Sequence, residues 1–320
     1  MCMSGIGGQA VLEGVMMKNK DAYAVAVRKP DGEIDVEVEV FHGVAAGSKL
    51  SKVPFLRGVF AFIDSLSLGL RSLNHSASFY EDDTATETKA DKAMGKIFGE
   101  KAEKVETGLV VALSFVIALA LFMLLPYFLS TLLSKVIQNT SLIIIFEGII
   151  RLIIFLLYIV AITAMNDIKR LYMYHGAEHK CINCIEHGHP LTVRNVKRAS
   201  RFHKRCGTSF LLFVMIVSII VFLFITVDNQ VLKVVLRIAL LPVIAGISYE
   251  IIHLAGKSDN IFIRIISAPG TGLQKLTTKE PDDDMIEVAI KSVEAVFDWR
   301  AFLEEKFDYV VKTDDGKEEE

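Results

Sequence analysis

The sequence predicts an α-helical multi-pass membrane protein with four transmembrane helices and a small cytosolic α+β part that includes a β-hairpin. Of its 320 residues 52% are hydrophobic, yet 23% are charged, so the chain is too apolar for an ordinary soluble protein and too polar to lie wholly in a bilayer. Long apolar stretches lie between residues 109 and 255. A shorter stretch before them alternates apolar and acidic residues, which is typical of a strand.

Residues 1–75 form a cytosolic N-terminal region in this prediction. Segments 22–27 and 33–40 flank Lys29-Pro30-Asp31-Gly32 and are expected to pair as a β-hairpin with one acidic face. The glycine-punctuated run 7–18 has two interpretations: a tight turn that leads into this hairpin, or a segment from which Gln9 and Glu13 reach a ligand. Residues 54–73 are expected to form a helix at the membrane interface, because their few charges recur every seven residues on an apolar surface. Residues 76–107 are predicted to be a charged linker.

Residues 108–255 contain four apolar stretches of membrane-spanning length. About 20 apolar residues suffice to cross a hydrocarbon core roughly 30 Å thick. The expected spans are Leu109–Leu133, Leu142–Met165, Thr208–Val227 and Val231–Ala255.

Orientation follows from the distribution of Lys and Arg. The segment 166–207 carries nine of them, whereas the loop 134–141 carries only Lys135. The positive-inside rule therefore places segment 166–207 in the cytosol of a cell-membrane protein, and an even number of spans puts both termini on that side. Anionic membrane lipids are the expected partners of the basic cluster, and homo-oligomerisation stays open. A net charge of −3 gives no case for nucleic-acid binding.

Residues 256–310 form a cytosolic C-terminal region in this prediction. Pro269-Gly270-Thr271-Gly272 is expected to be a loop, and the segment 277–281 resembles a helix start. Residues 284–297 are predicted to form an amphipathic helix. The acidic segment 311–320 is expected to be disordered.

The cytosolic segment 166–207 contains most of the chain's metal-ligand residue types. If the segment is helical, His175 and His179 share one face and can hold one ion. Glu178 lies beside them, and H-x-x-E-H is the inverted zincin pattern, in which the carboxylate activates a water. Lys180 is a candidate electrophilic or anion-binding partner. A divalent metal, with zinc as the first choice, is therefore the expected cofactor.

Two alternatives for completing a metal site stay open. An open site with a position left for reactants would take its third ligand from His203, Cys206 or Glu250. A closed structural site would instead combine four ligands with Cys3His spacing, namely Cys181, Cys184, His203 and Cys206.

Four segments together resemble the YqhQ family of bacterial membrane proteins. They are Gly8–Met17, Tyr174–Lys180, Arg205–Phe210 and Leu276–Pro281. This family is designated a domain of unknown function and is described as metal-dependent enzymes, so the resemblance implies a metal site without naming a substrate. It gives weight to the residues of this sequence that match its motifs, which are His175, Glu178, His179, Lys180 and Cys206. The pair Cys181 and Cys184 lies outside the family pattern, which favours the open site.

The sequence thus predicts a zinc-type hydrolase at the cytosolic face of the membrane, acting on a membrane-associated peptide or lipid-linked substrate of unknown identity. Glu178 would be the general base, and His175 and His179 would hold the metal. One alternative is a non-enzymatic membrane scaffold in which a closed zinc site folds the central segment. Another is a transporter of a metal ion or small solute.

Overall fold

The computed structural model describes residues 2–49, 53–80, 102–133, 135–225, 227, 229–257 and 260–309. The chain divides into two compact units. The sheet unit comprises Met1–Tyr80, Ile162–Leu212 and Ala245–Glu320, and the helical unit comprises Glu81–Ala161 and Phe213–Ile244. Most of the expected linker and all of the expected acidic tail lie outside the described residues.

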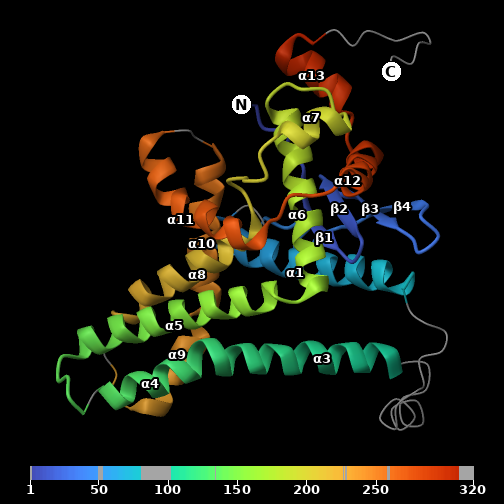
Figure 1. Ribbon diagram of the computed structural model, residues 1–320. Helices are drawn as coiled ribbons and strands as arrows, with labels where there is room; N and C mark the ends of the chain where they lie inside the picture. The colour runs from blue at the N-terminus through green and yellow to red at the C-terminus, as the bar shows by residue number, and fades with distance from the viewer. Residues whose placement is uncertain are drawn as a thin grey trace, which may run out of the picture. The chain divides into compact units, whose positions relative to one another are not determined.

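The sheet unit contains a four-stranded antiparallel sheet in the order β1-β2-β3-β4 (Figure 1). Its strands are β1 (Gly7–Val11), β2 (Gly14–Asn19), β3 (Ala22–Arg28) and β4 (Ile34–Val40). The hairpin predicted from the acidic alternation is confirmed as β3 and β4, which pair from Ala22 opposite Val40 to Arg28 opposite Ile34. The run 7–18 is a second hairpin, β1 with β2, and not only a turn before the first one.

The β1–β2 hairpin was not predicted, because its turn lacks the residues that usually signal a hairpin. Val11 pairs with Gly14, so the turn is Leu12-Glu13, and Glu13 has a φ of +47°. Hairpin turns with positive φ are normally signalled by Asn-Gly or Asp-Gly, which are missing here. Gly14 is needed in the strand itself, because a Cβ on it would lie 2.3 Å from the carbonyl oxygen of Ala26. The glycine therefore marks a close approach of neighbouring strands.

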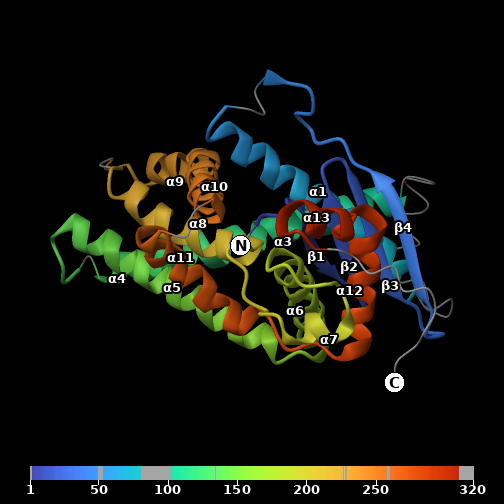
Figure 2. The ribbon, with the colours of Figure 1, turned by 90° about the horizontal axis from the view of Figure 1, so that it is seen from above.

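The two faces of the sheet pack against different helices, as strand alternation requires. On one face Val15 and Met17 join a core formed with α6 (Asn166–Glu186) and α12 (Asp283–Val296). Figure 2 shows α12 lying along the sheet. On the other face Met16 packs in a cluster that includes Leu68 of α1 (Leu56–Ser78). Helix α6, which carries the candidate site, is thus fixed by the larger core.

Three further helices complete the described C-terminal and central parts of this unit. They are α7 (Val193–Arg198), α11 (Ile261–Thr277) and α13 (Trp299–Phe307). The predicted amphipathic helix is confirmed as α12 and the predicted N-terminal helix as α1. The expected loop at Pro269–Gly272 is wrong, since α11 continues through Pro269. Tertiary contacts outweigh the low helix propensity of proline and glycine in this stretch. One such contact is made by the Gln274 amide, which donates to the His203 carbonyl and accepts from the His203 N–H.

The helical unit begins with a nearly continuous helix interrupted by one π-helical turn. Its segments are α3 (Ala102–Leu119), η3 (Ala120–Leu124) and α4 (Leu125–Leu133). In the π turn the N–H of Leu125 donates to the carbonyl of Ala120. Pro126 follows directly and has no N–H, so the widened turn absorbs the missing hydrogen bond without ending the helix.

A buried charge cluster joins three helices of this unit. Glu147 of α5 (Thr140–Thr163) accepts from both guanidinium ends of Arg237, at 2.7 and 2.8 Å, on α9 (Gln230–Ala239). Arg151, one turn along α5, donates to the same carboxylate at 2.7 Å. Arg151 also donates to Ser218 of α8 (Gly207–Phe222). The Glu147 carboxylate is therefore the shared acceptor of two buried guanidinium groups.

The described residues contain two helices that are long and apolar enough to cross a membrane, Gly108–Leu133 and Thr140–Thr163. A third span results if Gln230–Ala239 and Leu241–Ala255, which meet at a 41° bend, are counted together. Helix α8 is apolar but shorter than a full span. The break before α10 (Leu241–Lys257) coincides with Pro242, which cannot donate in a helix interior. Membrane association is supported, whereas the expected count of four spans is not confirmed.

Candidate functional site

Helix α6 places two histidines on one face. His175 and His179 are four residues apart, and their ring centroids are 4.4 Å apart. The helix is regular through Gly176 despite the low helix propensity of glycine. A Cβ at Gly176 would lie 2.0 Å from the carbonyl oxygen of Lys279. The glycine is therefore needed because the segment before α12 crosses α6 at this point.

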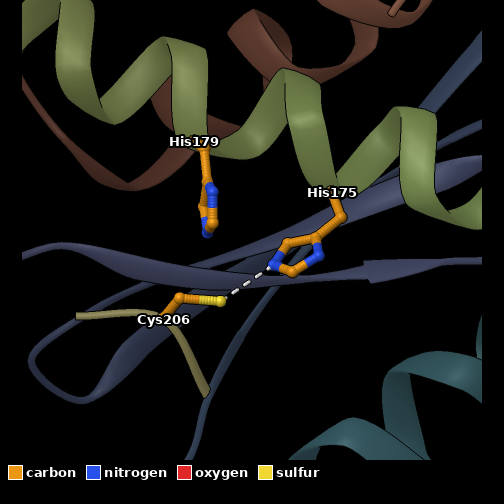
Figure 3. Close-up of side chains that lie close together, drawn as sticks. All are labelled: His175, His179 and Cys206. Carbon is orange, nitrogen blue, oxygen red and sulfur yellow. Dashed lines mark hydrogen bonds between the residues drawn. The ribbon is translucent and has the colours of Figure 1, made fainter. Parts of the chain in front are cut away.

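Cys206, just before α8, completes a three-residue cluster. Its Sγ lies 3.3 Å from Nε2 of His175, and one ligand atom from each of His175, His179 and Cys206 lies within 4.8 Å of the other two. Figure 3 shows the two rings projecting from α6 toward the sulfur. The described residues contain no other such group of His, Cys, Asp and Glu. Of the three candidates for a third ligand, the structure brings Cys206 to the histidines.

Backbone carbonyls orient both imidazoles. Nδ1 of His175 lies 2.9 Å from the Thr277 carbonyl oxygen, and Nδ1 of His179 lies 2.7 Å from that of Arg201. A carbonyl oxygen only accepts, so each Nδ1 carries a proton and each Nε2 is the atom left for the cluster. Metal-binding histidines are held in this way in most metalloproteins. Neither Thr277 nor Arg201 could be assigned this role from the sequence, because the main chain supplies the acceptor.

Charges in the cluster stabilise one another strongly. Burial lowers the pKa of His175, but the Cys206 thiolate and its hydrogen bond outweigh burial and raise the pKa to about 9. The pKa of His179 is raised against burial by the same thiolate and by Glu178. Burial raises the pKa of Cys206, yet the two imidazolium charges hold it well below its usual range. The site thus favours a thiolate, which is the form that binds metals and attacks electrophiles.

Glu178 lies beside both rings. Its Oε2 is 3.8 Å from Nε2 of His175 and 3.8 Å from Nε2 of His179, and the residue is buried. Gly8 of β1 allows this position, since a Cβ there would lie 3.0 Å from Cγ of Glu178. The carboxylate is therefore adjacent to the cluster without a close hydrogen bond to either ring. That leaves its oxygens available to a water or substrate.

A cavity of about 740 Å³ opens onto these groups. Its volume is in the range of about 300–1,000 Å³ that is usual for small-molecule sites. His175, Glu178, His179 and Cys206 all line it. The remaining walls come from β1 and the residues before it, from β2, from α1, from the segment before α8 and the start of α8, and from α10. The cluster is therefore open to a ligand on one side.

The structure corrects the expectations for Lys180 and His203. The Lys180 ammonium donates to the carbonyls of Lys197 and Ala199 and pairs with Glu280 at 2.9 Å, so it faces away from the cavity lining. Its contacts support the segment after α6 and offer nothing to a reactant. His203 does line the cavity, but its Nε2 faces Glu186 at 3.4 Å. Its imidazole is therefore directed to another partner and lies outside the metal-ligand group.

Glu250 is also removed from the expected ligand set. Its carboxylate accepts from Nε of Arg57 at 2.7 Å and from the N–H of Phe55. The Glu250 carboxylate does not join the histidines, because groups at the N-terminal end of α1 donate hydrogen bonds to it. Glu250 therefore fastens α1 to α10.

The described residues do not assemble the closed Cys3His site, which would combine three cysteines and one histidine. Cys181 and Cys184 belong to the apolar core between α6 and the sheet. The Cys184 thiol donates to the carbonyls of His189 and Pro190, and burial raises its pKa to about 12. Both cysteines thus behave as small buried apolar residues.

Glu186 is a structural centre that sequence reasoning missed. This buried carboxylate accepts from Arg205 at 2.6 Å, from the N–H and hydroxyl of Ser4, and lies 3.4 Å from Nε2 of His203. It connects the end of α6, the N-terminus and the loop that holds Cys206. The last residue of a charged helix carries no signal that it will be buried, so only the fold reveals this role.

Replacing Glu186 by Gln should lower the unfolding free energy by about 1–3 kcal/mol at pH 7, because the partly exposed Arg205 guanidinium loses its counter-charge and the hydrogen bonds from Ser4 weaken. Burial raises the pKa of Glu186, but the hydrogen bonds from His203 and Ser4 and the Arg205 charge lower it below 4.5. A depressed folded pKa stabilises the protein above the unfolded value of about 4.3 and ceases to do so as pH falls through the folded pKa. The difference in unfolding free energy between the wild type and Glu186→Gln, measured by denaturation, should therefore be smaller below pH 4 than at pH 7. The exposed Glu287→Gln variant is the control, and an equal loss in both variants would contradict this role.

Comparison with known proteins gives a relationship but no activity. A profile of the family described as "Protein of unknown function (DUF1385)" matches residues 53–299. The chain is also 38% identical over 301 residues to the "Uncharacterized protein YqhQ" of Bacillus subtilis (strain 168), which covers 93% of this chain and 94% of that protein. No solved structure matches. The resemblance seen in the motifs is confirmed, and neither description mentions a metal or a reaction.

Proposed function

Because the chain belongs to the DUF1385 family, whose description states no function, we propose a function from the site: a metal-dependent hydrolase of the zinc type at the cytosolic face of the cell membrane. The observation that carries this proposal is the convergence of two Nε2 atoms and one thiolate on one point beside a cavity. Two histidines and one cysteine with an open fourth position is a ligand set used by catalytic zinc.

The donor chemistry fits zinc. Imidazole and thiolate are both preferred zinc ligands, and tetrahedral bonds of about 2.0–2.3 Å hold ligand atoms roughly 3.3–3.8 Å apart. The 3.3 Å separation between Sγ of Cys206 and Nε2 of His175 is in that range. Both Nδ1 atoms are already bonded to carbonyls, so the lone pairs of Nε2 would be free for an ion. Small movements of the His179 side chain would bring its Nε2 into the same range of separation from the other two ligand atoms.

The residues have separate roles in this proposal. His175, His179 and Cys206 would hold the zinc, which would make a bound water acidic and polarise the scissile carbonyl or phosphoryl group. Glu178 takes the proton from the attacking water and returns it to the leaving group. The apolar parts of the cavity wall exclude bulk water from the reacting atoms.

The membrane arrangement is part of the proposal. We propose four spans, in which α8 and the bent α9–α10 pair join the two long helices, with the site and both termini on the cytosolic side. The nine Lys and Arg residues between 166 and 206 support this orientation. The substrate would then be a membrane-associated molecule that reaches the site from the inner leaflet.

Metal analysis of the purified full chain tests the proposed site. The wild-type protein should contain about one zinc per chain, and His175→Ala, His179→Ala and Cys206→Ser should each bind zinc at least about tenfold more weakly. Cys184→Ser is the matched control and should retain its zinc, because that sulfur lies in the apolar core. In cobalt-substituted protein a sulfur-to-metal absorption band should disappear only in the Cys206 variant. Loss of zinc in Cys184→Ser with retention in Cys206→Ser would contradict the proposal.

The thiolate–imidazolium pair favours one second candidate, a cysteine hydrolase that needs no metal. Cys206 would attack a carbonyl to form a thioester and release the leaving group, which takes its proton from His175; water would then hydrolyse the thioester. The 3.3 Å contact and the lowered pKa of Cys206 support it. A chain that takes up no zinc in titration, but is alkylated selectively at Cys206 by iodoacetamide, would favour this second candidate over the first.

A further inference from the structure

The cavity beside the cluster has two chemically different parts. One part is formed by polar and charged groups on β1, β2 and the segment before α8. The other part is apolar. Its residues on α1, α8 and α10 are Ala61, Phe62, Leu68, Phe210, Leu211 and Ile252, and Ile6, Met16 and Ile182 add further apolar atoms to the lining. Phe62 of α1 and Phe210 of α8 contact each other in this lining, with ring centroids 5.4 Å apart and the rings tilted by 34°. A ligand that fills both parts must be amphiphilic.

The polar part is cationic. Lys18, Lys20 and Arg205 line it, against Asp64 and Glu178. The Asp64 carboxylate already accepts from the N–H of Val44 at 2.7 Å, and Glu178 belongs to the cluster. Within the part of the chain that the structure describes, neither Lys18 nor Lys20 forms an ion pair with a carboxylate. The Lys18 ammonium lies 4.8 Å from the centroid of the Phe41 ring and Lys20 is exposed, so both ammonium groups can still donate hydrogen bonds to an anionic ligand.

The apolar part continues onto the outer surface of the sheet unit. Phe62 and Leu211 line the cavity, yet they remain 36% and 41% exposed. Next to Phe62 on α1, Ile63 and Leu66 are 42% and 58% exposed. Exposed apolar surface on an amphipathic helix is typical of contact with lipid. A hydrocarbon chain could thus pass from the bilayer into the cavity along apolar atoms.

We propose that the cavity binds a single-chain anionic amphiphile, with a carboxylate or phosphate headgroup at Lys18 and Lys20 and its hydrocarbon chain along Phe62, Phe210 and Leu211. This inference rests on the proposed function in that it names the substrate class of the same site. A headgroup held there would place the bond next to it within the cavity that His175, Glu178 and Cys206 also line. In an amphiphile whose chain is joined to the anionic headgroup through an ester or amide, the water oxygen would bond to the acyl carbon and the C–O or C–N bond would break. The alcohol or amine would leave with the proton that Glu178 took from the water, and a fatty acid without such a bond would bind as the product.

Photo-crosslinking in uncharged phosphatidylcholine nanodiscs tests this binding without requiring turnover. The probe is an oleate analogue with a diazirine on its chain, and the crosslinked peptides of the full-length protein are mapped by mass spectrometry. Crosslinks should map to segments 60–68 and 206–211 and should be displaced by oleate or lysophosphatidate but not by oleyl alcohol. A stronger effect of one competitor identifies the headgroup as carboxylate or phosphate, and either supports the proposal.

Matched variants separate headgroup from chain recognition. Lys18→Gln with Lys20→Gln should weaken binding about tenfold or more, because charge-assisted hydrogen bonds to an anion are lost, while the exposed Lys291→Gln control should not. Phe62→Ala should weaken binding, and Leu73→Ala on the same helix, which is 43% exposed and does not line the cavity, should not. Displacement by oleyl alcohol as strong as by oleate, displacement by an acidic peptide alone, or crosslinks only on the spans would overturn the proposal.

Zinc content measured on the same samples separates this inference from the proposed function. Specific crosslinking in a chain that takes up no zinc leaves the amphiphile site standing and removes the zinc hydrolase. If the chain binds zinc but shows no specific crosslinks, the metal site is supported and the amphiphile-binding site is contradicted.

Discussion

Glu147→Gln should destabilise the helical unit by about 3–5 kcal/mol, the cost expected when a buried charge loses its partner. The Glu147 carboxylate is the acceptor for both Arg237 and Arg151, and all three side chains are almost completely buried. Gln can accept from one guanidinium but carries no charge, so two cations would remain together in an apolar environment. Thermal unfolding in detergent, followed by circular dichroism, should show the midpoint fall by many degrees.

Two further variants make that result specific. Lys135→Gln removes an exposed charge from the same unit and should leave the midpoint within experimental error. Adding Arg151→Met to Glu147→Gln removes one of the excess cations and should recover part of the lost stability. An unchanged midpoint in Glu147→Gln would mean that the triad contributes no net stability.

Gly176→Ala should both destabilise the sheet unit and loosen the candidate site. The added Cβ would lie 2.0 Å from the Lys279 carbonyl oxygen, so the segment before α12 would have to move. Overpacking of this kind costs about 1–3 kcal/mol, which exceeds the gain of about 1 kcal/mol from replacing glycine in a helix. Thr277, at the end of α11 and two residues before Lys279, supplies the carbonyl that orients His175, so zinc affinity should fall by about 10–100-fold.

Gly272→Ala provides the matched control for Gly176→Ala. Gly272 also lies inside a helix, α11, but a Cβ there would meet no atom within 4 Å. This variant should be as stable as the wild type or more stable by up to about 1 kcal/mol, and its zinc affinity should not change. Equal stabilities for the two variants would show that the crossing at Gly176 tolerates a methyl group.

Much of the helical and strand content was predictable because its signal is local. The acidic alternation before residue 40 indicated the β3–β4 hairpin, and the charge-free stretch from residue 109 indicated the first span. The β1–β2 hairpin was not predictable, because Glu13 occupies a position where glycine or asparagine is expected. Helix α11 was not predictable either, because Gln274, which holds it to the loop at His203, acts across 71 positions of the sequence.

For the candidate site, the sequence indicated the residue types but could not select among them. Four-residue spacing was enough to put His175 and His179 on one face once α6 proved helical. The choice of Cys206 over His203 or Glu250 depended on which groups had other partners. Glu186 and Arg57 provide those partners from distant segments. Such competition is a property of the folded chain, so no local pattern reports it.

Helix α6 presents its histidines on one side while its buried residues, among them Cys181, Ile182 and Ile185, form the core with β2 and α12. A deep mutational scan scored by protein abundance should therefore find positions 174–186 intolerant whether or not they take part in chemistry. Enzymatic importance would be hidden by expression defects along this helix. Cys206 and Lys18, which come from outside α6, are the positions where a scan scored by both abundance and activity could distinguish the two requirements.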